Sequence, residues 1–299
     1  MYNFVNKKKC NFCNSSKEKH KLIGYRLSKS QGLITNKRNK DFVTKIYKCS
    51  DCKLIFCNPQ PEPIDEFLRY EKLEFKQMTT LQDKNLFEKE LNIVKNFFKK
   101  EIKNKKSLEI GSGLGLILNK LHQNGYEVHG IEPTKNFYEK SILLHPHLKT
   151  NIYNNSIEKA DFKKLYFDLI TLTSVLEHLY DPNEALKKSL RWLRKGGLIH
   201  IEVPHSNWLI SKLINIIKKL FFQKYVTNLS PMHLPFHYYE FSLDSFILNG
   251  KINGYKVKEY YIRESEIDFK IPKFIKYILI YLMKKTKSGK QLIVFLEKI

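Results

Sequence analysis

Three glycines and a distant acid have the spacing in this sequence that points most directly to chemistry. Residues 107–115 read SLEIGSGLG, an apolar strand that runs into Gly111, Gly113 and Gly115. A second strand-like run, YEVHGIE, ends at Glu132, twenty-one residues after Gly111. Glycines let a backbone approach a ligand closely, and a carboxylate at the next strand end accepts hydrogen bonds from ribose hydroxyls. The spacing therefore predicts a nucleoside-binding site.

The order of the glycines separates two kinds of nucleoside ligand. A dinucleotide fingerprint reads G-x-G-x-x-G, but Leu116 stands where its third glycine belongs. The motif E-x-G-x-G-x-G and the later acid instead resemble the first two motifs of class I S-adenosylmethionine-dependent methyltransferases. The resemblance implies S-adenosylmethionine as cofactor, with a binding set in its first two motifs of Glu109, Gly111, Ser112, Gly113, Gly115 and Glu132.

Segments further along the chain extend this resemblance to roughly residues 85–299. FDLITLTSVLEHLYDP at 167–182 reads as a buried strand that passes into polar residues. LRKGGLIHIEVP at 193–204 reads as the end of a helix, stopped at Gly196-Gly197, and then a strand that ends at Pro204. NGYKVKEYYI at 253–262 and QLIVFLEKI at 291–299 match the closing antiparallel pair of the family. The implied fold is α/β, a Rossmann-like seven-stranded class I methyltransferase sheet whose last strand is antiparallel.

Two places at strand ends complete the expected cofactor site. Thr173 ends the strand that begins at residue 167, and ligands of parallel sheets lie at such ends. Ser156 and Ile157 follow a short third strand, where the resembled family places the adenine. A plain loop is the alternative interpretation of these two residues.

Four cysteines form two identical pairs near the start of the sequence. Cys10-x-x-Cys13 and Cys49-x-x-Cys52 are separated by thirty-five residues. Four thiolates in two pairs suit tetrahedral zinc, and four cysteines leave no open position for catalysis, so we expect a structural ion. Disulfides are the competing interpretation, and a reducing cytoplasm disfavours them. Cys57 is expected to be a buried thiol.

These elements predict a division of the chain into three parts. Residues 1–62 are expected to form a zinc-ribbon-like domain, and residues 63–100 a helical linker with cleft-forming helices. Residues 101–299 are expected to form the methyltransferase domain, with a lid-like insertion around 205–240. This combination resembles zinc-ribbon methyltransferases of nucleotide-sugar and surface-glycan biosynthesis. The resemblance implies a small acceptor that is a sugar or a nucleotide-linked sugar.

Histidines near the strand ends are the candidate catalytic bases. A hydroxyl or an acidic C–H acceptor needs a base with a pKa near neutrality, and His178, His205, His233 and His237 are available. His237 and the following FS resemble the H-x-x-x-F-S element of sugar C-methyltransferases, which implies a base over the acceptor. The tyrosine that precedes that histidine in the family is replaced here by leucine, so Tyr239 or its neighbour is expected to substitute or to pack. Oxygen, carbon and nitrogen all stay open as the accepting atom.

The net charge of +23, from 53 Lys and Arg against 30 Asp and Glu, supports a rival interpretation. A basic surface and a zinc ribbon would also suit an RNA-modifying methyltransferase or a nucleic-acid-binding protein. The lysines, however, are spread through nearly every segment, and no NPPY-like tetrad follows the fourth strand. Phosphorylated small acceptors fit the same positive charge, and we expect these in preference to nucleic acid.

The sequence also carries an expectation about location. It has no apolar run of eighteen residues and no signal-peptide pattern, which predicts a cytoplasmic protein. Residues 208–225 and 272–285 combine apolar residues with lysines, as basic amphipathic helices on anionic bilayers do. Peripheral contact with the inner face of the membrane is therefore one prediction for these segments. A lid over the substrate and a packing helix are the alternatives, and we favour them.

Overall fold

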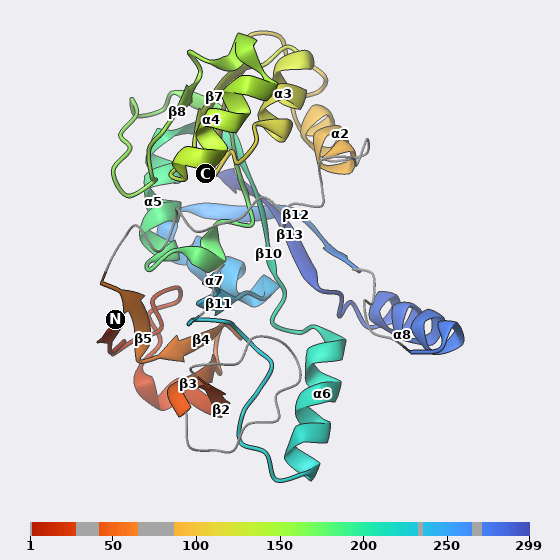
Figure 1. Cartoon of the computed structure of the whole chain (residues 1–299). Helices are drawn as coiled ribbons and strands as arrows, with labels where there is room; N and C mark the ends of the chain where they lie inside the picture. Colours follow the sequence, from red (N-terminus) through yellow and green to blue (C-terminus); the bar gives the residue numbers. More distant parts are fainter. Residues whose placement is uncertain (1, 28–41, 65–86, 233–235, 265–270) are drawn as a thin grey trace.

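The structure is a computed structural model that describes residues 2–27, 42–64, 87–232, 236–264 and 271–299. Within these residues, seven strands form one sheet in the order β12-β13-β10-β9-β6-β7-β8, in which β13 runs antiparallel to both neighbours (Figure 1). This confirms the predicted seven-stranded sheet. The strands are β6 (Lys106–Ile110), β7 (Glu127–Ile131), β8 (Ile152–Tyr153), β9 (Phe167–Thr173), β10 (Leu193–Pro204), β12 (Tyr255–Arg263) and β13 (Gln291–Lys298).

Helices cover both faces of this sheet, which explains why its central strands are apolar on both sides. Side chains of β9 alternate between the two cores, since Leu169 packs with helices on one face and Ile170 packs with helices on the other. Helices α2 (Glu88–Phe97) and α3 (Leu116–Gln123) cover the Leu169 face, and α5 (Pro182–Trp192) and α7 (Leu243–Asn253) cover the Ile170 face. Helix α4 (Lys135–Leu144) joins β7 to β8.

Local signals place the two helices that border the site. Asp181 caps α5 by accepting hydrogen bonds from the backbone amides of Asn183 and Glu184, both at 3.0 Å, and proline follows at the first helical position. Ser242 and Ser245 form a reciprocal capping box at the start of α7, and Gly254 ends that helix with φ 75°. These caps fix where the strand-end loops stop.

A second sheet has four strands in the order β11-β4-β3-β2. Its strand β11 comes from the predicted insertion at 205–240, far along the chain, and pairs Tyr239 with Phe56 and Glu240 with Ile55. The N-terminal segment and the insertion therefore build one sheet together. The strands are β2 (His20–Leu27), β3 (Phe42–Cys49), β4 (Ile55–Asn58) and β11 (Tyr239–Glu240), beside the separate pair β1 (Tyr2–Val5) and β5 (Gln60–Pro63).

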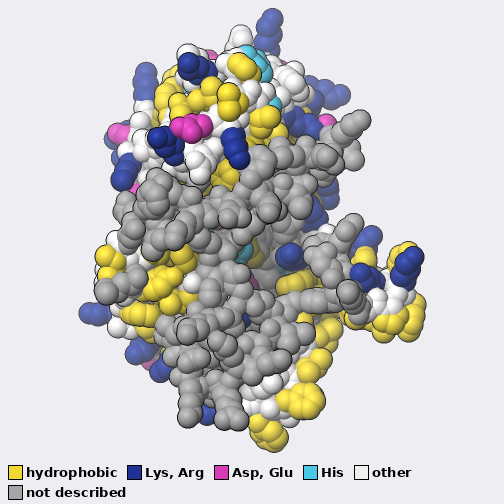
Figure 2. Space-filling model, viewed as in Figure 1, with side chains coloured by type: hydrophobic (Ala, Val, Ile, Leu, Met, Phe, Trp, Pro, Cys, Tyr) yellow, Lys and Arg dark blue, Asp and Glu magenta, His cyan; other side chains and the backbone are white. Residues whose placement is uncertain are grey.

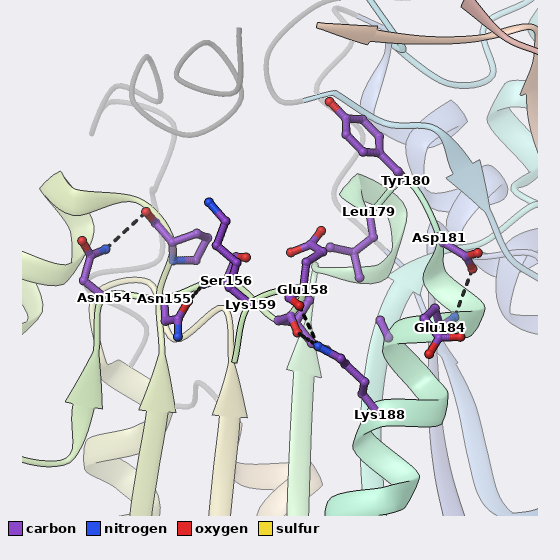
Figure 3. Close-up of a pocket in the computed structure, with 13 residues that line it drawn as sticks. Asn154, Asn155, Ser156, Glu158, Lys159, Leu179, Tyr180, Asp181, Glu184 and Lys188 are labelled. Atoms are coloured by element: carbon purple, nitrogen blue, oxygen red, sulfur yellow. Dashed lines mark hydrogen bonds between the residues drawn. The ribbon is translucent and has the colours of Figure 1, made fainter. Parts of the chain in front are cut away.

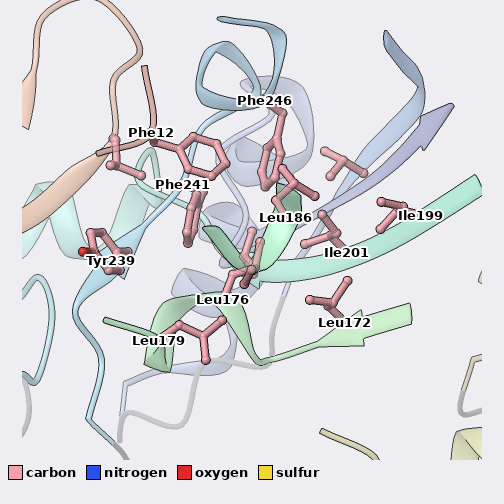
Figure 4. Packing of buried hydrophobic residues seen from close by; sticks show 14 of the residues in the cluster. Phe12, Leu172, Leu176, Leu179, Leu186, Ile199, Ile201, Tyr239, Phe241 and Phe246 are labelled. Carbon is pink, nitrogen blue, oxygen red and sulfur yellow. The ribbon is translucent and has the colours of Figure 1, made fainter. Parts of the chain in front are cut away.

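The two sheets share one hydrophobic core (Figure 4). Phe12 of the N-terminal segment makes edge-to-face contacts with Phe241 at 5.3 Å and with Phe246 of α7 at 5.4 Å between ring centroids. The side-chain amide of Asn249 donates to the Phe12 carbonyl at 2.6 Å. The predicted division at residue 62 stays a prediction, but residues on its two sides are packed in a continuous interior.

Two helices extend away from the body of the molecule, α6 (Leu209–Leu220) and α8 (Lys273–Lys285) (Figure 1). Figure 2 shows apolar side chains along the outer parts of both helices, with basic side chains beside those of α8. Phe222, just after α6, is 91% exposed and Tyr277 of α8 is 71% exposed. Among the described helices, none is long and apolar enough to cross a membrane. Membrane contact through these helices stays a prediction.

Candidate active site

The glycine-rich turn leaves β6 at the carboxyl edge of the large sheet. Gly111, Gly113 and Gly115 have φ values of 71°, 53° and 73°. Residues other than glycine rarely adopt this backbone conformation. A Cβ atom at Gly111 would lie 2.6 Å from Cγ2 of Val175, which is too close for any contact. The glycines are therefore required by the shape of the turn that lies against the loop after β9.

Glu132 follows β7 and joins this turn to the next helix. Its carboxylate oxygens accept hydrogen bonds from the backbone amides of Gly113 and Thr134, each at 2.8 Å. The side chain is buried, and burial raises its pKa. Each oxygen has a second lone pair, so the held carboxylate can also accept hydrogen bonds from the two hydroxyls of a ribose. This arrangement fits the predicted role of Glu132.

Three predicted cofactor residues carry buried polar atoms that have no hydrogen-bond partner among the described residues. These atoms are Oε2 of Glu109, Oγ of Ser112 and Oγ1 of Thr173. Ile110 of β6 pairs with Leu172 of β9, so Thr173 lies level with the start of the glycine turn. Burial raises the pKa of Glu109 well above its usual value. Unsatisfied buried polar groups are uncommon, and a polar ligand at this edge would satisfy them.

A cavity of about 400 Å³ lies between the turn after β8 and the start of α5 (Figure 3). Ser156 and Ile157, predicted to flank the adenine, line it together with Pro133, which directly follows Glu132. The Lys188 ammonium of α5 donates to the carbonyl of Ile157 at 3.0 Å, which fixes the turn that carries both residues. The cavity is also bordered by residues that the sequence did not single out, namely Asn154, Asn155, Glu158, Lys159, Leu179, Tyr180, Asp181, Glu184 and Ala185.

Two of the predicted histidines meet at the end of β9. The rings of His178 and His237 are 4.6 Å apart between centroids and nearly perpendicular. Nδ1 of His178 lies 2.8 Å from the Phe236 carbonyl, so the neutral ring donates from Nδ1 and keeps Nε2 as an acceptor. Burial lowers the pKa of His237 well below its usual value, with His178 as a second cause. The His237 ring is therefore neutral near pH 7.

Glu177 completes this group, and it was not among the predicted catalytic residues. Its Oε1 lies 3.8 Å from Nε2 of His178, and candidate ligand atoms of Glu177, His178 and His237 all lie within 4.8 Å of one another. Burial raises the pKa of Glu177 to about 8, so its carboxyl group is mostly protonated at neutral pH. The only sequence signal for this role is its place directly before His178.

The other predicted catalytic residues lie elsewhere. Nδ1 of His205 lies 3.1 Å from the Gly289 carbonyl, and burial lowers the pKa of this histidine to about 4. The hydroxyl of Tyr239 donates to Oε1 of Gln60 at 2.8 Å and accepts from the amide of Asn11 at 2.7 Å. These contacts tie β11 to the N-terminal segment, so we do not include Tyr239 in the proposed chemistry. His233 lies outside the described residues.

The four predicted metal ligands form one cluster. The sulfurs of Cys10 and Cys52 are 3.7 Å apart, as are those of Cys13 and Cys49. Tetrahedral zinc with bonds of about 2.3 Å requires sulfur atoms separated by about 3.8 Å, whereas a disulfide requires about 2.05 Å. All five cysteines are free thiols, and Cys57 is buried in β4 as expected. The four thiols therefore fit a tetrahedral ion.

Comparison with known proteins addresses the family of the chain. A family model described as a methyltransferase domain matches residues 83–255, more than half of the sequence. The ubiquinone biosynthesis O-methyltransferase of Bradyrhizobium diazoefficiens is 29% identical over 104 residues, which are 34% of this chain and 40% of that protein. The protein of the same name from Coxiella burnetii is 27% identical over 132 residues, 44% of this chain and 54% of that protein. The chain thus spans about half the length of these relatives.

Two solved structures are similar to this chain. A methyltransferase solved with the Trm112 activator of Haloferax volcanii is 12% identical, with a TM-score of 0.50, over 72% of this chain and 93% of that chain. An S-adenosylmethionine-dependent methyltransferase from Methanosarcina mazei gives a TM-score of 0.49 at 15% identity, over 69% of this chain and 97% of that chain. The sheet order, the glycine turn and the family match lead to one conclusion: the chain belongs to the methyltransferase-domain family.

Proposed function

We propose that this enzyme methylates a hydroxyl group of a small acceptor, and that the acceptor is a sugar or a nucleotide-linked sugar. The observation that carries the proposal is the pairing of His178 and His237 beside the expected donor site. Oxygen as the accepting atom is supported by the two relatives, which are both named O-methyltransferases. The sugar class is supported by the H-x-x-x-F-S element that begins at His237.

The donor site would be assembled mainly from backbone atoms and one acid. When bound, S-adenosylmethionine supplies an electrophilic methyl group on a sulfonium with a neutral leaving thioether. Glu132 would accept the ribose hydroxyls, and Ser156 and Ile157 would border the adenine in the cavity beside them. Thr173 and Ser112 would contribute the hydroxyls that lack partners. Because the leaving group is good, alignment of donor and acceptor supplies much of the rate acceleration.

The acceptor hydroxyl would lose its proton to the histidine pair as the new carbon–oxygen bond forms. His237 is the proposed base, since its ring lies against that of His178 and it occupies the histidine position of the H-x-x-x-F-S element. The proton moves from the acceptor oxygen to the ring nitrogen, and the methyl group moves from sulfur to that oxygen, which yields a methyl ether and S-adenosylhomocysteine. General base catalysis of this kind contributes roughly 10²–10⁴ in rate.

The cysteine cluster would hold one zinc ion with a structural role. Its four sulfurs occupy all four tetrahedral positions, which leaves none for a water or a substrate. The backbone supports the cluster, since the carbonyl of Cys52 accepts hydrogen bonds from the hydroxyls of Ser242 at 2.7 Å and Ser245 at 2.9 Å. The ion would thereby fix the loop that packs against the start of α7.

A replacement of the proposed base tests this function. His237→Asn should lower the single-turnover rate at least about 100-fold with hydroxylated sugars and nucleotide-linked sugars as acceptors. Binding of S-adenosylhomocysteine, measured by calorimetry, should stay unchanged because the donor residues are intact. His147→Asn replaces an exposed histidine on the far side of the large sheet and should keep the full rate.

The alternatives give distinct outcomes in the same assay. A rate loss in His178→Asn with none in His237→Asn would move the role of base to His178. Full activity in both variants would contradict a histidine base. Methyl transfer to RNA transcripts, with none to small acceptors, would replace the small-molecule proposal by the RNA-modifying alternative.

A further inference from the structure

A second cavity, of about 590 Å³, lies between the four-stranded sheet and α6. Its walls come from β2, from Lys48 of β3, from α6 and from the chain segment that returns after α6. Ser206, which lies just beyond the end of β10, also lines it. We call this cavity the basic pocket. It is separate from the cavity of about 400 Å³ that Ser156 and Ile157 line, and the two cavities share no lining residue.

The basic pocket concentrates positive charge. Lys48, Lys212, Lys219 and Lys224 line it, and no acidic residue is present among the described residues of its wall. The pKa of Lys48 is lowered, mainly by burial and next by the neighbouring Lys212. Glu240 and Asp244 act on Lys48 from beyond the lining. Ammonium groups that lie close together repel one another, so they attract an anion that neutralises their charge.

Polar groups in and behind the wall lack partners among the described residues. Oγ of Ser206 and Nε1 of Trp208 are buried donors without an acceptor, and Ser206 is only 5% exposed. Lys218 on α6 is 6% exposed, and its ammonium lies 4.0 Å from the ring centre of Tyr225 without a hydrogen-bond acceptor. Ser206 and Trp208 line the pocket, so an anion there would accept hydrogen bonds from both of these groups.

The position of the pocket connects it to the acceptor side of the enzyme. The amide of Ser206 donates to the Phe241 carbonyl at 2.7 Å, and Phe241 lies four residues after His237. Asn228, on the opposite wall, donates to Glu240 of β11 at 2.6 Å. The segment that carries His237 is therefore held directly by residues of the pocket wall.

We propose that the basic pocket binds the phosphate or diphosphate group of the acceptor, while the methylated hydroxyl reaches the histidine pair. Lysine ammonium groups and the Ser206 hydroxyl would donate to the phosphate oxygens. This inference rests on the proposed small-molecule acceptor. It adds the chemical class of the group that anchors that acceptor, and it assigns α6 and β3 to substrate binding.

Trp208 provides a direct signal for binding. The chain has two tryptophans, and the other, Trp192, is completely buried in the core. Titration with inorganic pyrophosphate at low salt should change the fluorescence of Trp208 in a saturable way, and calorimetry should give the same affinity. Lys212→Gln/Lys219→Gln should weaken binding at least about tenfold, because two of the four lining cations are removed.

A matched variant controls for total charge. Lys135→Gln/Lys149→Gln removes the same charge from exposed positions around α4 and should leave pyrophosphate affinity unchanged. Equal weakening in both double variants, or no saturable binding by the unmodified protein, would overturn the proposal. Thermal melts and S-adenosylhomocysteine binding on the same variants separate a failed pocket from a misfolded protein or from a failed donor site.

Competition identifies the source of the phosphate. Displacement of pyrophosphate by a soluble nucleoside diphosphate would support a nucleotide-linked acceptor, and displacement by phosphatidic acid vesicles would support a lipid-borne one. Displacement by neither compound, or by RNA alone, would overturn the assignment of the pocket to a small anionic acceptor.

Discussion

The proposed donor side and the proposed acceptor side of this protein are built in different ways. On the donor side, the amide of Gly113 donates a hydrogen bond to Glu132, nineteen residues further along the chain. Much of this side therefore comes from one short segment of the sequence. On the acceptor side, Tyr239 bonds to Gln60 across 179 positions, and Asn249 bonds to Phe12 across 237. The comparison indicates that damage to the donor side stays local, whereas damage to the N-terminal segment spreads to the acceptor side.

The largest expected effect comes from loss of the metal. Structural zinc contributes roughly 10–16 kcal/mol of apparent binding free energy in small domains. Cys49→Ser, or treatment with a strong chelator, should therefore remove the proposed zinc ion. Elemental analysis should show a loss of one equivalent of zinc per chain. Either change should also lower the melting temperature by more than about 10 °C. S-adenosylhomocysteine affinity should change far less than acceptor turnover.

Cys57→Ala is the matched control for the metal experiment. It removes a buried thiol of β4 that lies outside the cluster of four, so it should destabilise the fold modestly and keep the zinc. A loss of donor affinity as large as the loss of acceptor turnover in Cys49→Ser would contradict the separation of the two sides.

A smaller effect is expected at the donor site. Glu132→Ala removes an acceptor from the ribose hydroxyls, and a hydrogen bond to a charged group contributes about 1.5–3 kcal/mol. Calorimetry should therefore show a loss of S-adenosylhomocysteine affinity of roughly tenfold to one-hundredfold. Glu127→Ala removes an acid from the opposite end of β7 and should keep the affinity. Equal losses in the two variants would rule out the assigned role of Glu132.

The buried Glu177 should make stability depend on pH. Its pKa is raised to about 8 by burial, so its contribution to stability is complete below the unfolded value near 4.5 and is lost as the pH rises through about 8. Glu177→Gln stays neutral and should be more stable than the unmodified protein at pH 9, by about 1–3 kcal/mol, with little gain at pH 5. Denaturant titrations at both pH values provide the measurement.

An exposed acid of α5 controls for the pH experiment. Glu184→Gln removes a solvent-exposed carboxylate near the same site, so it should not alter the pH dependence of stability. If Glu177→Gln behaved like Glu184→Gln, the Glu177 carboxyl group would be charged in the folded protein at neutral pH.

The smallest expected effect is at Tyr239. Tyr239→Phe removes a hydroxyl that bonds to Gln60 and Asn11, which should lower the free energy of unfolding by about 1–2 kcal/mol. The turnover rate should fall less than about threefold, since the hydroxyl is occupied by structural contacts. Tyr260→Phe, at an exposed position of β12, should change neither quantity. A hundredfold rate loss with unchanged stability would instead make Tyr239 catalytic.

Much of the fold could be predicted because its signals are local. The turn at Gly111 needs positive φ values that glycine adopts easily. The paired C-x-x-C spacing brings two thiols together in each knuckle, so the gathering of all four follows from one hairpin. These features depend on neighbouring residues and are therefore visible in the order of the amino acids.

The rest depended on contacts between distant segments. Nothing in the spacing of the sequence indicates that Tyr239 pairs with Phe56, because a two-residue strand has no periodicity to detect. The raised pKa of Glu177 arises from burial that only the packed structure defines. The lysines of the basic pocket are also separated along the chain, so their convergence is a property of the fold.

The short strand β11 limits which segments of this protein can be exchanged with those of a relative. Since Tyr239 and Glu240 complete the edge of β4, a grafted N-terminal segment from another methyltransferase would meet a foreign strand at that edge. A chimera with a different substrate preference would therefore need the N-terminal segment and the strand β11 from the same parent protein. The breakpoints would lie on either side of the seven-stranded sheet.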